Sequence, residues 1–213
     1  MAAESRQDKK LATRQALKVS ALECFAKNGW DATSVGSIAR AAGVAHGTVY
    51  VHFATKEALA DELLADFNAG LEARLRPVWA EGKGSVEARV RRTAEVFLEH
   101  WEAERHFVQA YAQRLGGAPR LETLRDGVNP PAVMLVTALL GTLVGDDARS
   151  AARVALAAQG LLALWLRIGL QVLFGKGVRR EDAVETLTQL TLGAAKALGS
   201  PEGTKKHRKE RRR

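Results

Sequence analysis

The stretch "GTVYVHFATKEAL", residues 47–59, has the composition of a strand and the position of a helix. Residues 48–53 alternate in polarity and are rich in β-branched and aromatic side chains, which favour strands. Helical periodicity nevertheless precedes the stretch and resumes after it. We therefore interpret it as a short helix whose residues are selected by two opposite surfaces, so that packing overrides local propensity.

The residues around this stretch predict two short helices at 34–41 and 45–52, separated by a glycine turn. This arrangement is a helix-turn-helix. Val49 and Phe53 are four residues apart and share one face, which we expect to be buried. Thr48, Tyr50 and His52 then point elsewhere, and such groups bind phosphate oxygens of nucleic acids. The second helix is thus expected to have one buried surface and one that faces DNA.

The remainder of the chain predicts an all-α protein. Apolar residues recur at helical spacing at 17–28, 59–75 and 86–101, shorter helices are expected near 104–114 and 120–126, and two long helices are expected at about 147–174 and 180–198. The segment 154–174 is long enough to be considered as a membrane span. Because it contains Gln159, Arg167 and Gln171, we interpret it as a helix of a core or a subunit interface.

The net charge of +8 is unevenly distributed along the 213 residues. Residues 1–59 carry +3, residues 60–204 carry −1, and the nine residues 205–213, "KKHRKERRR", carry +6. We expect this tail to be disordered and to add salt-sensitive attraction to nucleic acid. A single cysteine and an N-terminus without the apolar core of a signal peptide indicate a cytoplasmic protein.

Residues 14–59 resemble the DNA-binding domain of the tetracycline-repressor (TetR) family. The resemblance depends on an ordered set rather than on one short motif. The matching residues are Arg14, Leu17, Ala21, Phe25, Gly29, Trp30, Thr33, Ile38, Ala39, Ala42, Gly43, Val44, Gly47, Thr48, Val49, Tyr50, Phe53, Lys56, Glu57 and Leu59.

The resemblance implies a homodimer of all-α subunits with a three-helix DNA-binding domain at 1–55. A helical domain at 56–204, which begins with a connecting helix at 56–75, would bind a small molecule and form the dimer, and the tail would follow at 205–213. The expected function is that of a repressor that binds a palindromic operator in double-stranded DNA. A small apolar or amphipathic effector would release it, and no cofactor is implied.

The resemblance also implies which residues meet DNA. They are Thr33, Ser34, Gly36, Ala45, His46, Gly47, Thr48, Tyr50, His52 and Lys56. Tyr50 and Lys56 are expected to hold phosphates, and His46 to read bases; His52 could equally pack against the next helix. The family often has arginine at the position of Gly36, and an arginine could reach a guanine edge, which glycine cannot.

The C-terminal part predicts two further sets of residues. Candidates to line an effector pocket are Phe97, His100, Trp101, Phe107, Tyr111, Met134, Gln159 and Trp165, although each taken alone is more simply a core or surface residue. Candidates for the dimer interface are Leu162, Leu166, Leu170, Leu173, Ala183, Leu187, Leu190, Ala194 and Leu198, which form one face on each of the two long helices.

Two other classes of function are weaker readings of the sequence. A protein that coats nucleic acid nonspecifically through its basic tail would show no preference for a palindrome. An enzyme would need a catalytic constellation, and the histidines and the cysteine show no metal-ligand spacing. "FGKG" at 174–177 lacks the earlier glycine and the Ser/Thr of a phosphate-binding loop. We therefore predict that the protein is not an enzyme.

Overall fold

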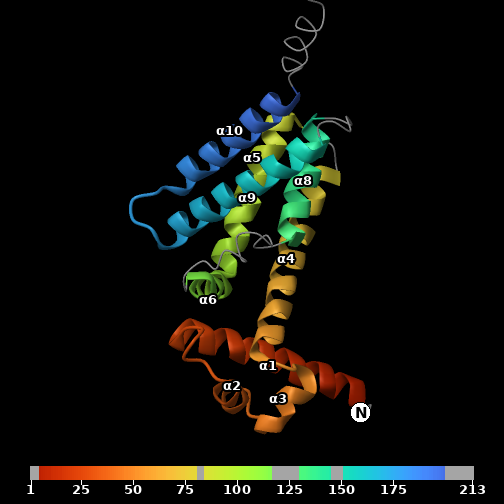
Figure 1. Ribbon diagram of the computed structural model, residues 1–213, viewed down its shortest axis with the longest axis vertical. Coiled ribbons are helices and arrows are strands. Elements are labelled where there is room, and N and C mark those ends of the chain that lie inside the picture. The colour runs from red at the N-terminus through yellow and green to blue at the C-terminus, as the bar shows by residue number, and fades with distance from the viewer. Residues whose placement is uncertain (1–4, 81–83, 117–129, 145–150, 200–213) are drawn as a thin grey trace, which may run out of the picture. The chain divides into compact units, whose positions relative to one another are not determined.

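The computed structural model describes residues 5–80, 84–116, 130–144 and 151–199, and these residues form helices without a strand (Figure 1). The helices are α1 (Arg6–Asn28), α2 (Val35–Ala41), α3 (His46–His52), α4 (Lys56–Ala80), α5 (Val86–Ala103), α6 (Arg105–Gly116), α8 (Pro130–Val144), α9 (Ala151–Phe174) and α10 (Arg180–Gly199). The all-α prediction is confirmed. The helix expected at 120–126 and the tail at 205–213 lie outside the described residues.

The chain divides into two compact units. Among the described residues, the first unit comprises 5–70 and 103–116, and the second comprises 71–80, 84–102, 130–144 and 151–199. The division falls within α4, which continues past Pro77 to Ala80 rather than ending at residue 75. The domain boundary expected at residue 55 stays a prediction.

In the first unit, α1 provides the longest buried stripe. Ser5 caps the helix, its hydroxyl accepting from the amide of Asp8, and Gly29 ends it with φ of +83°. Leu17, Ala21 and Phe25 are buried at the four-residue spacing that the sequence showed. The helix α2 packs against α1, and α3 packs against α2, so the two seven-residue helices are anchored to α1 in sequence.

The opening stretch is helical, as predicted. Val49 and Phe53 are 2% and 3% exposed, whereas Tyr50 and Val51 are 51% and 70% exposed. The valine and aromatic composition therefore does not mark a strand. It reflects one anchored face and one open face on a helix of only two turns.

In the second unit, aromatic side chains pack against a glycine of α9. A Cβ atom at Gly169 would lie 2.7 Å from the Trp101 ring, so only glycine permits this close approach. The Phe97 ring lies 4.8 Å from that of Trp101 and 5.1 Å from that of Trp165. The indole N–H of Trp165 donates to Thr191 of α10 at 3.2 Å, which joins α5, α9 and α10 in one core.

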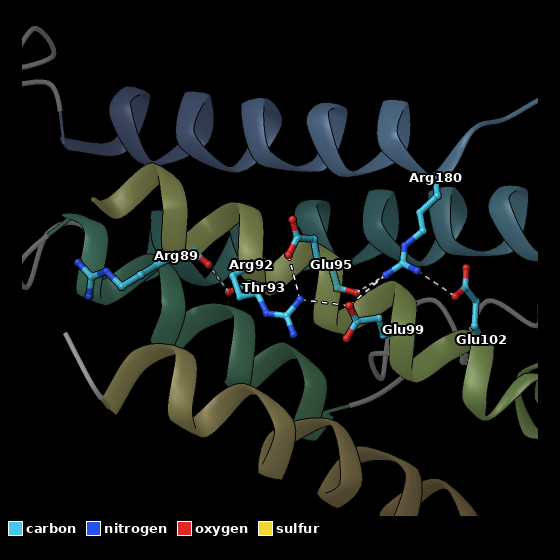
Figure 2. A network of polar contacts seen from close by, with 7 residues as sticks. All are labelled: Arg89, Arg92, Thr93, Glu95, Glu99, Glu102 and Arg180. Carbon is cyan, nitrogen blue, oxygen red and sulfur yellow. Dashed lines mark hydrogen bonds and ion pairs between the residues drawn. The ribbon is translucent and has the colours of Figure 1, made fainter. Parts of the chain in front are cut away.

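Ion pairs surround this core where α10 begins (Figure 2). Arg180 of α10 pairs with Glu99 and Glu102 of α5 at 3.2 and 3.3 Å. Arg92 pairs with Glu95 and Glu99, and these carboxylates raise its pKa through hydrogen bonds. All these side chains are half-exposed, so each pair contributes roughly 0–1 kcal/mol. The network therefore contributes little to the stability of the unit.

The helix α9 is long and apolar enough to cross a membrane by length and composition alone. In the protein it carries a buried stripe that includes Val154, Ala158, Trp165 and Leu173. That stripe packs within the second unit, which is the first of the two alternatives, core or subunit interface, that the sequence left open. Leu156, Leu164 and Phe174 remain 71%, 45% and 42% exposed on other sides of the helix.

Candidate nucleic-acid interface

The open surface of α2 and α3 contains most of the residues predicted to meet DNA. Ser34, Ala45, His46, Gly47 and Tyr50 are exposed, and Gly36, Thr48 and His52 are half-exposed. This exposure leaves the groups of this surface available to a partner.

Two helices contribute to this surface at one point. A Cβ atom at Gly36 would lie 3.7 Å from the imidazole of His46, so α2 and the start of α3 adjoin there. The His46 ring also packs edge-on against the Tyr50 ring, with centroids 5.4 Å apart and planes at 79°. His46 thus lies between the backbone of α2 at Gly36, which has no side chain, and Tyr50 on the next turn of α3.

Ser34 and Thr33 both have structural tasks, and the sequence predicted that one of them caps the second helix. Ser34 caps α2, its hydroxyl accepting from the amide of Ser37 while the Ser37 hydroxyl accepts from the amide of Ser34. Thr33 is 1% exposed, and its hydroxyl contacts the carbonyls of Cys24 and Gly29 at 3.0 and 2.7 Å. The placement of the Thr33 side chain at the DNA surface is therefore corrected: burial commits it to the α1–α2 turn.

Lys56 is also committed to the interior of the unit. Its ammonium donates to the carbonyls of Trp30 and Thr33 at 2.9 and 3.0 Å, and it lies 4.5 Å from the centroid of the Trp30 ring. The sequence predicted a phosphate contact for this lysine, or a merely solvated one. In the structure it ties the start of α4 to the turn before α2, and the phosphate contact stays a prediction.

A cluster of charged side chains joins α1 to α3 and α4, and the sequence gave no indication of its geometry. Arg14 makes a two-point ion pair with Glu62, donates to the carbonyl of His52 at 2.6 Å and lies over the Phe53 ring at 4.2 Å. Lys18 pairs with Glu62 and Asp66 at 2.8 and 2.5 Å. The only sequence signal was a pair of basic residues four apart on the inward side of α1.

The cluster shifts the acid–base behaviour of its members. The hydrogen bond from Arg14 and the neighbouring Lys18 lower the pKa of Glu62. Burial alone would lower the pKa of Lys18, but its hydrogen bonds to Asp66 and Glu62 outweigh burial and raise it. Burial, together with the charges of Arg14 and Lys10, lowers the pKa of His52. These shifts favour a neutral His52 near pH 7 and keep Lys18 and Glu62 charged. We call the cluster of Arg14, Lys18, Glu62 and Asp66 the brace of the first unit.

The candidate effector residues are divided between the two units. Phe97, His100, Trp101 and Trp165 are buried in the second unit, whereas Phe107 and Tyr111 belong to the first. Phe107, Tyr111, Phe25 and Trp30 border a shallow apolar hollow within the first unit, and its cavity volume of about 10 Å³ is far below the usual 300–1,000 Å³ of ligand sites. Met134 is 72% exposed and Gln159 is exposed, so neither lines an enclosed pocket within the described protomer.

The candidate interface residues divide between the interior and the surface of the second unit. Leu162, Leu173, Ala183 and Leu187 are buried within the protomer, which makes them residues of its own core rather than the dimer-interface residues that the sequence suggested. Leu166, Leu170, Ala194 and Leu198 are half-buried, and Leu190 is 40% exposed. Periodicity located the apolar stripes but could not say which stripe faces the protomer's own core.

Comparison with known proteins relates the interface to a known family. Residues 19–63 match the model for bacterial regulatory proteins of the tetR family. Over 108 residues the chain is 38% identical to the HTH-type transcriptional repressor KstR2 of Mycobacterium tuberculosis, an alignment that covers 48% of this chain and 52% of that protein. The chain thus spans about half the length of the curated relatives it matches.

Solved structures extend the likeness to the fold of nearly the whole chain. A TetR-family regulator from Syntrophomonas wolfei superposes with a TM-score of 0.70 at 19% identity, covering 87% of this chain and 95% of that one. The fatty acid degradation regulator FadR from Bacillus halodurans gives 0.62 at 21% identity, with 85% and 95% covered. These relatives and neighbours are transcriptional regulators rather than enzymes.

Proposed function

We propose that the chain is a dimeric repressor that a small molecule releases from its operator, because residues 19–63 match the tetR-family model and the curated relatives are transcriptional repressors. The observation that supports this most is the exposed surface formed by Gly36, His46 and Tyr50 on two adjoining helices. A hydroxyl, an imidazole and bare backbone are groups suited to phosphates and base edges. Tyr50 is assigned to a phosphate and His46 to bases.

Dimerisation is proposed because one α3 of seven residues reads few base pairs. Two copies that bind half-sites one helical turn apart read twice as many, and their symmetry demands a palindromic operator. The exposed apolar residues Leu156, Leu164 and Phe174 of α9 and Leu190 of α10 are the proposed contacts with the second copy. They replace the buried members of the set that the sequence suggested.

The proposed effector is small and apolar or amphipathic. The second unit holds an aromatic cluster of Phe97, Trp101 and Trp165, together with His100, which is 3% exposed. A ligand that separates these rings would favour a different packing of α5 on α9. Release of DNA then follows as a population shift, because the operator fixes the spacing of the two α3 helices.

A second candidate function is nonspecific binding to nucleic acid through the tail at 205–213, which carries seven basic residues and one acidic residue. It predicts strong binding to any duplex at low salt and steep weakening as salt rises. A cytoplasmic location is proposed for either function, since both act on DNA.

Selection of bound duplexes from a random library by the full chain distinguishes the two functions. We expect a palindromic consensus that competes against a large excess of bulk DNA at physiological salt, and a dimer in sedimentation. Recovery of unrelated sequences that bulk DNA displaces would favour the tail-driven alternative. A monomer that binds a single half-site would contradict the dimer.

A further inference from the structure

The surface proposed to meet DNA lacks an uncommitted cation. Affinity for DNA comes largely from lysine and arginine side chains that neutralise phosphates. Among the residues predicted for that surface, Lys56 alone carries a fixed positive charge. Two backbone carbonyls and the Trp30 ring already occupy its ammonium group.

Two other cations near α3 are committed in the same way. Arg14 is held by Glu62, the His52 carbonyl and the Phe53 ring, and Lys18 is held by two carboxylates. A protein that binds phosphates through this unit therefore needs other basic side chains beside α3.

Lys10 of α1 is positioned so that its side chain lies beside the C-terminal end of α3. It precedes Arg14 by four residues on α1, so the two side chains project from the same face one turn apart. Arg14 contacts the carbonyl of His52, the last residue of α3. Lys10 is exposed and makes no ion pair within the described part of the chain. Its charge also contributes to the lowered pKa of His52, which agrees with this proximity.

Arg40 of α2 is positioned so that its side chain lies toward the N-terminal end of α3. It follows Gly36 by four residues on α2 and so shares its face, and that face adjoins the His46 ring. Helical side chains tilt toward the N-terminus of their helix, so Arg40 leans toward the surface that Gly36 leaves bare. Arg40 is exposed, and no ion pair joins it to another described residue.

We propose that Lys10 and Arg40 are the phosphate-binding cations of this protein, one beside each end of α3. The proposal rests on the proposed function, because it requires α3 to enter the major groove. A seven-residue helix is about 10 Å long, and the groove is about 12 Å wide between its phosphate backbones. Cations at both ends of α3 can thus reach the phosphates that border the groove.

The test measures the salt dependence of binding by the full chain. The variants are Lys10→Gln, Arg40→Gln and the double variant, and Lys27→Gln, at the other end of α1, is the control that removes the same charge. The probes are a duplex recovered by selection and a random duplex of equal length. Each single variant should lower the slope of log K against log salt by about one, and the double variant by about two.

In practical terms, losing one phosphate contact reduces the drop in affinity between 50 and 200 mM salt by about 3.5-fold. Lys10→Arg and Arg40→Lys should restore the wild-type slope, because they keep the charge. Lys27→Gln should leave the slope unchanged. Thermal unfolding of every variant confirms that the exposed substitutions leave the fold intact.

A second measurement locates Lys10 without DNA. Histidine titration by NMR should show a higher pKa for His52 in Lys10→Gln than in the wild type, and no change in Lys27→Gln. An unchanged His52 pKa would remove Lys10 from the end of α3 and overturn its assignment. If the wild type does not prefer the selected duplex, the proposed function fails. If it does, but both variants match Lys27→Gln in slope, this inference fails.

Discussion

The two units of the molecule are stabilised by different kinds of contact. In the first unit, polar side chains cross the interior: Arg14 joins α1 to α3 and α4, and Lys56 joins α4 to the turn before α2. In the second unit, rings and aliphatic side chains fill the interior, with Trp101 against Gly169, and ion pairs such as Arg180–Glu99 lie at the surface.

The difference follows from helix length. The two-turn helices α2 and α3 each bury only a few apolar residues, so packing alone cannot fix their direction. Directional hydrogen bonds to backbone carbonyls supply what is missing. The 20–24-residue helices α9 and α10 bury whole stripes and need no such brace. Substitutions should therefore act on stability in the second unit, and on both stability and DNA binding in the first.

The largest effect is expected for Leu187→Ala in α10, where the wild-type side chain is fully buried. Loss of its packing should lower the free energy of unfolding by about 3 kcal/mol. Leu190→Ala, on the same helix and 40% exposed, is the matched control and should cost less than about 1 kcal/mol while weakening the dimer. Denaturant unfolding at one protein concentration compares them, and equal losses would contradict the orientation of α10.

Arg14→Ala tests the brace of the first unit. It removes charged hydrogen bonds to Glu62 and to the His52 carbonyl, so stability should fall by about 2 kcal/mol. Because Arg14 lowers the pKa of Glu62 below 4.5, its contribution is fully present above that pH and is lost as pH falls through the lowered value. The difference between variant and wild type in unfolding experiments should shrink below pH 4.5; a constant difference would exclude the Glu62 pair as its source.

Lys56→Met separates a structural lysine from a phosphate contact. Loss of two hydrogen bonds and of the contact with Trp30 should lower stability by about 1–2 kcal/mol. The salt slope of DNA binding should stay that of the wild type. A slope lowered by one together with unchanged stability would restore the role that the sequence suggested for Lys56.

The smallest effect is expected for Tyr50→Phe, which removes one exposed hydroxyl from α3. DNA binding should weaken by about 1 kcal/mol for every operator variant, with no change in stability. His46→Ala is the contrast, since it should flatten the preference at one or two base positions of each half-site. Binding to a panel of single-base variants distinguishes them, and altered base preference in Tyr50→Phe would reassign that residue to base reading.

Much of the fold was predictable because helical periodicity is local. The helices α9 and α10 were expected within a few residues of their observed bounds, and α3 was correctly interpreted as a helix despite its strand-like composition. The exposure of Tyr50 was also predicted from the pattern of apolar residues around it, and the exposure of His46 from the family resemblance. These features depend on residues within a turn or two of each other, which the sequence shows directly.

What the sequence by itself determined is thus most of the helices, although not α8, together with the helix-turn-helix and most of the residues of its open face. Tertiary structure alone decided what Thr33 and Lys56 do, which leucines of α9 and α10 are buried, and that Arg14 reaches α3 from 38 residues away. The physical reason is that periodicity reports whether a side chain is apolar and which face it shares. Its partner is set by the angle at which helices meet, and a carbonyl that accepts a hydrogen bond leaves no mark on residue identity.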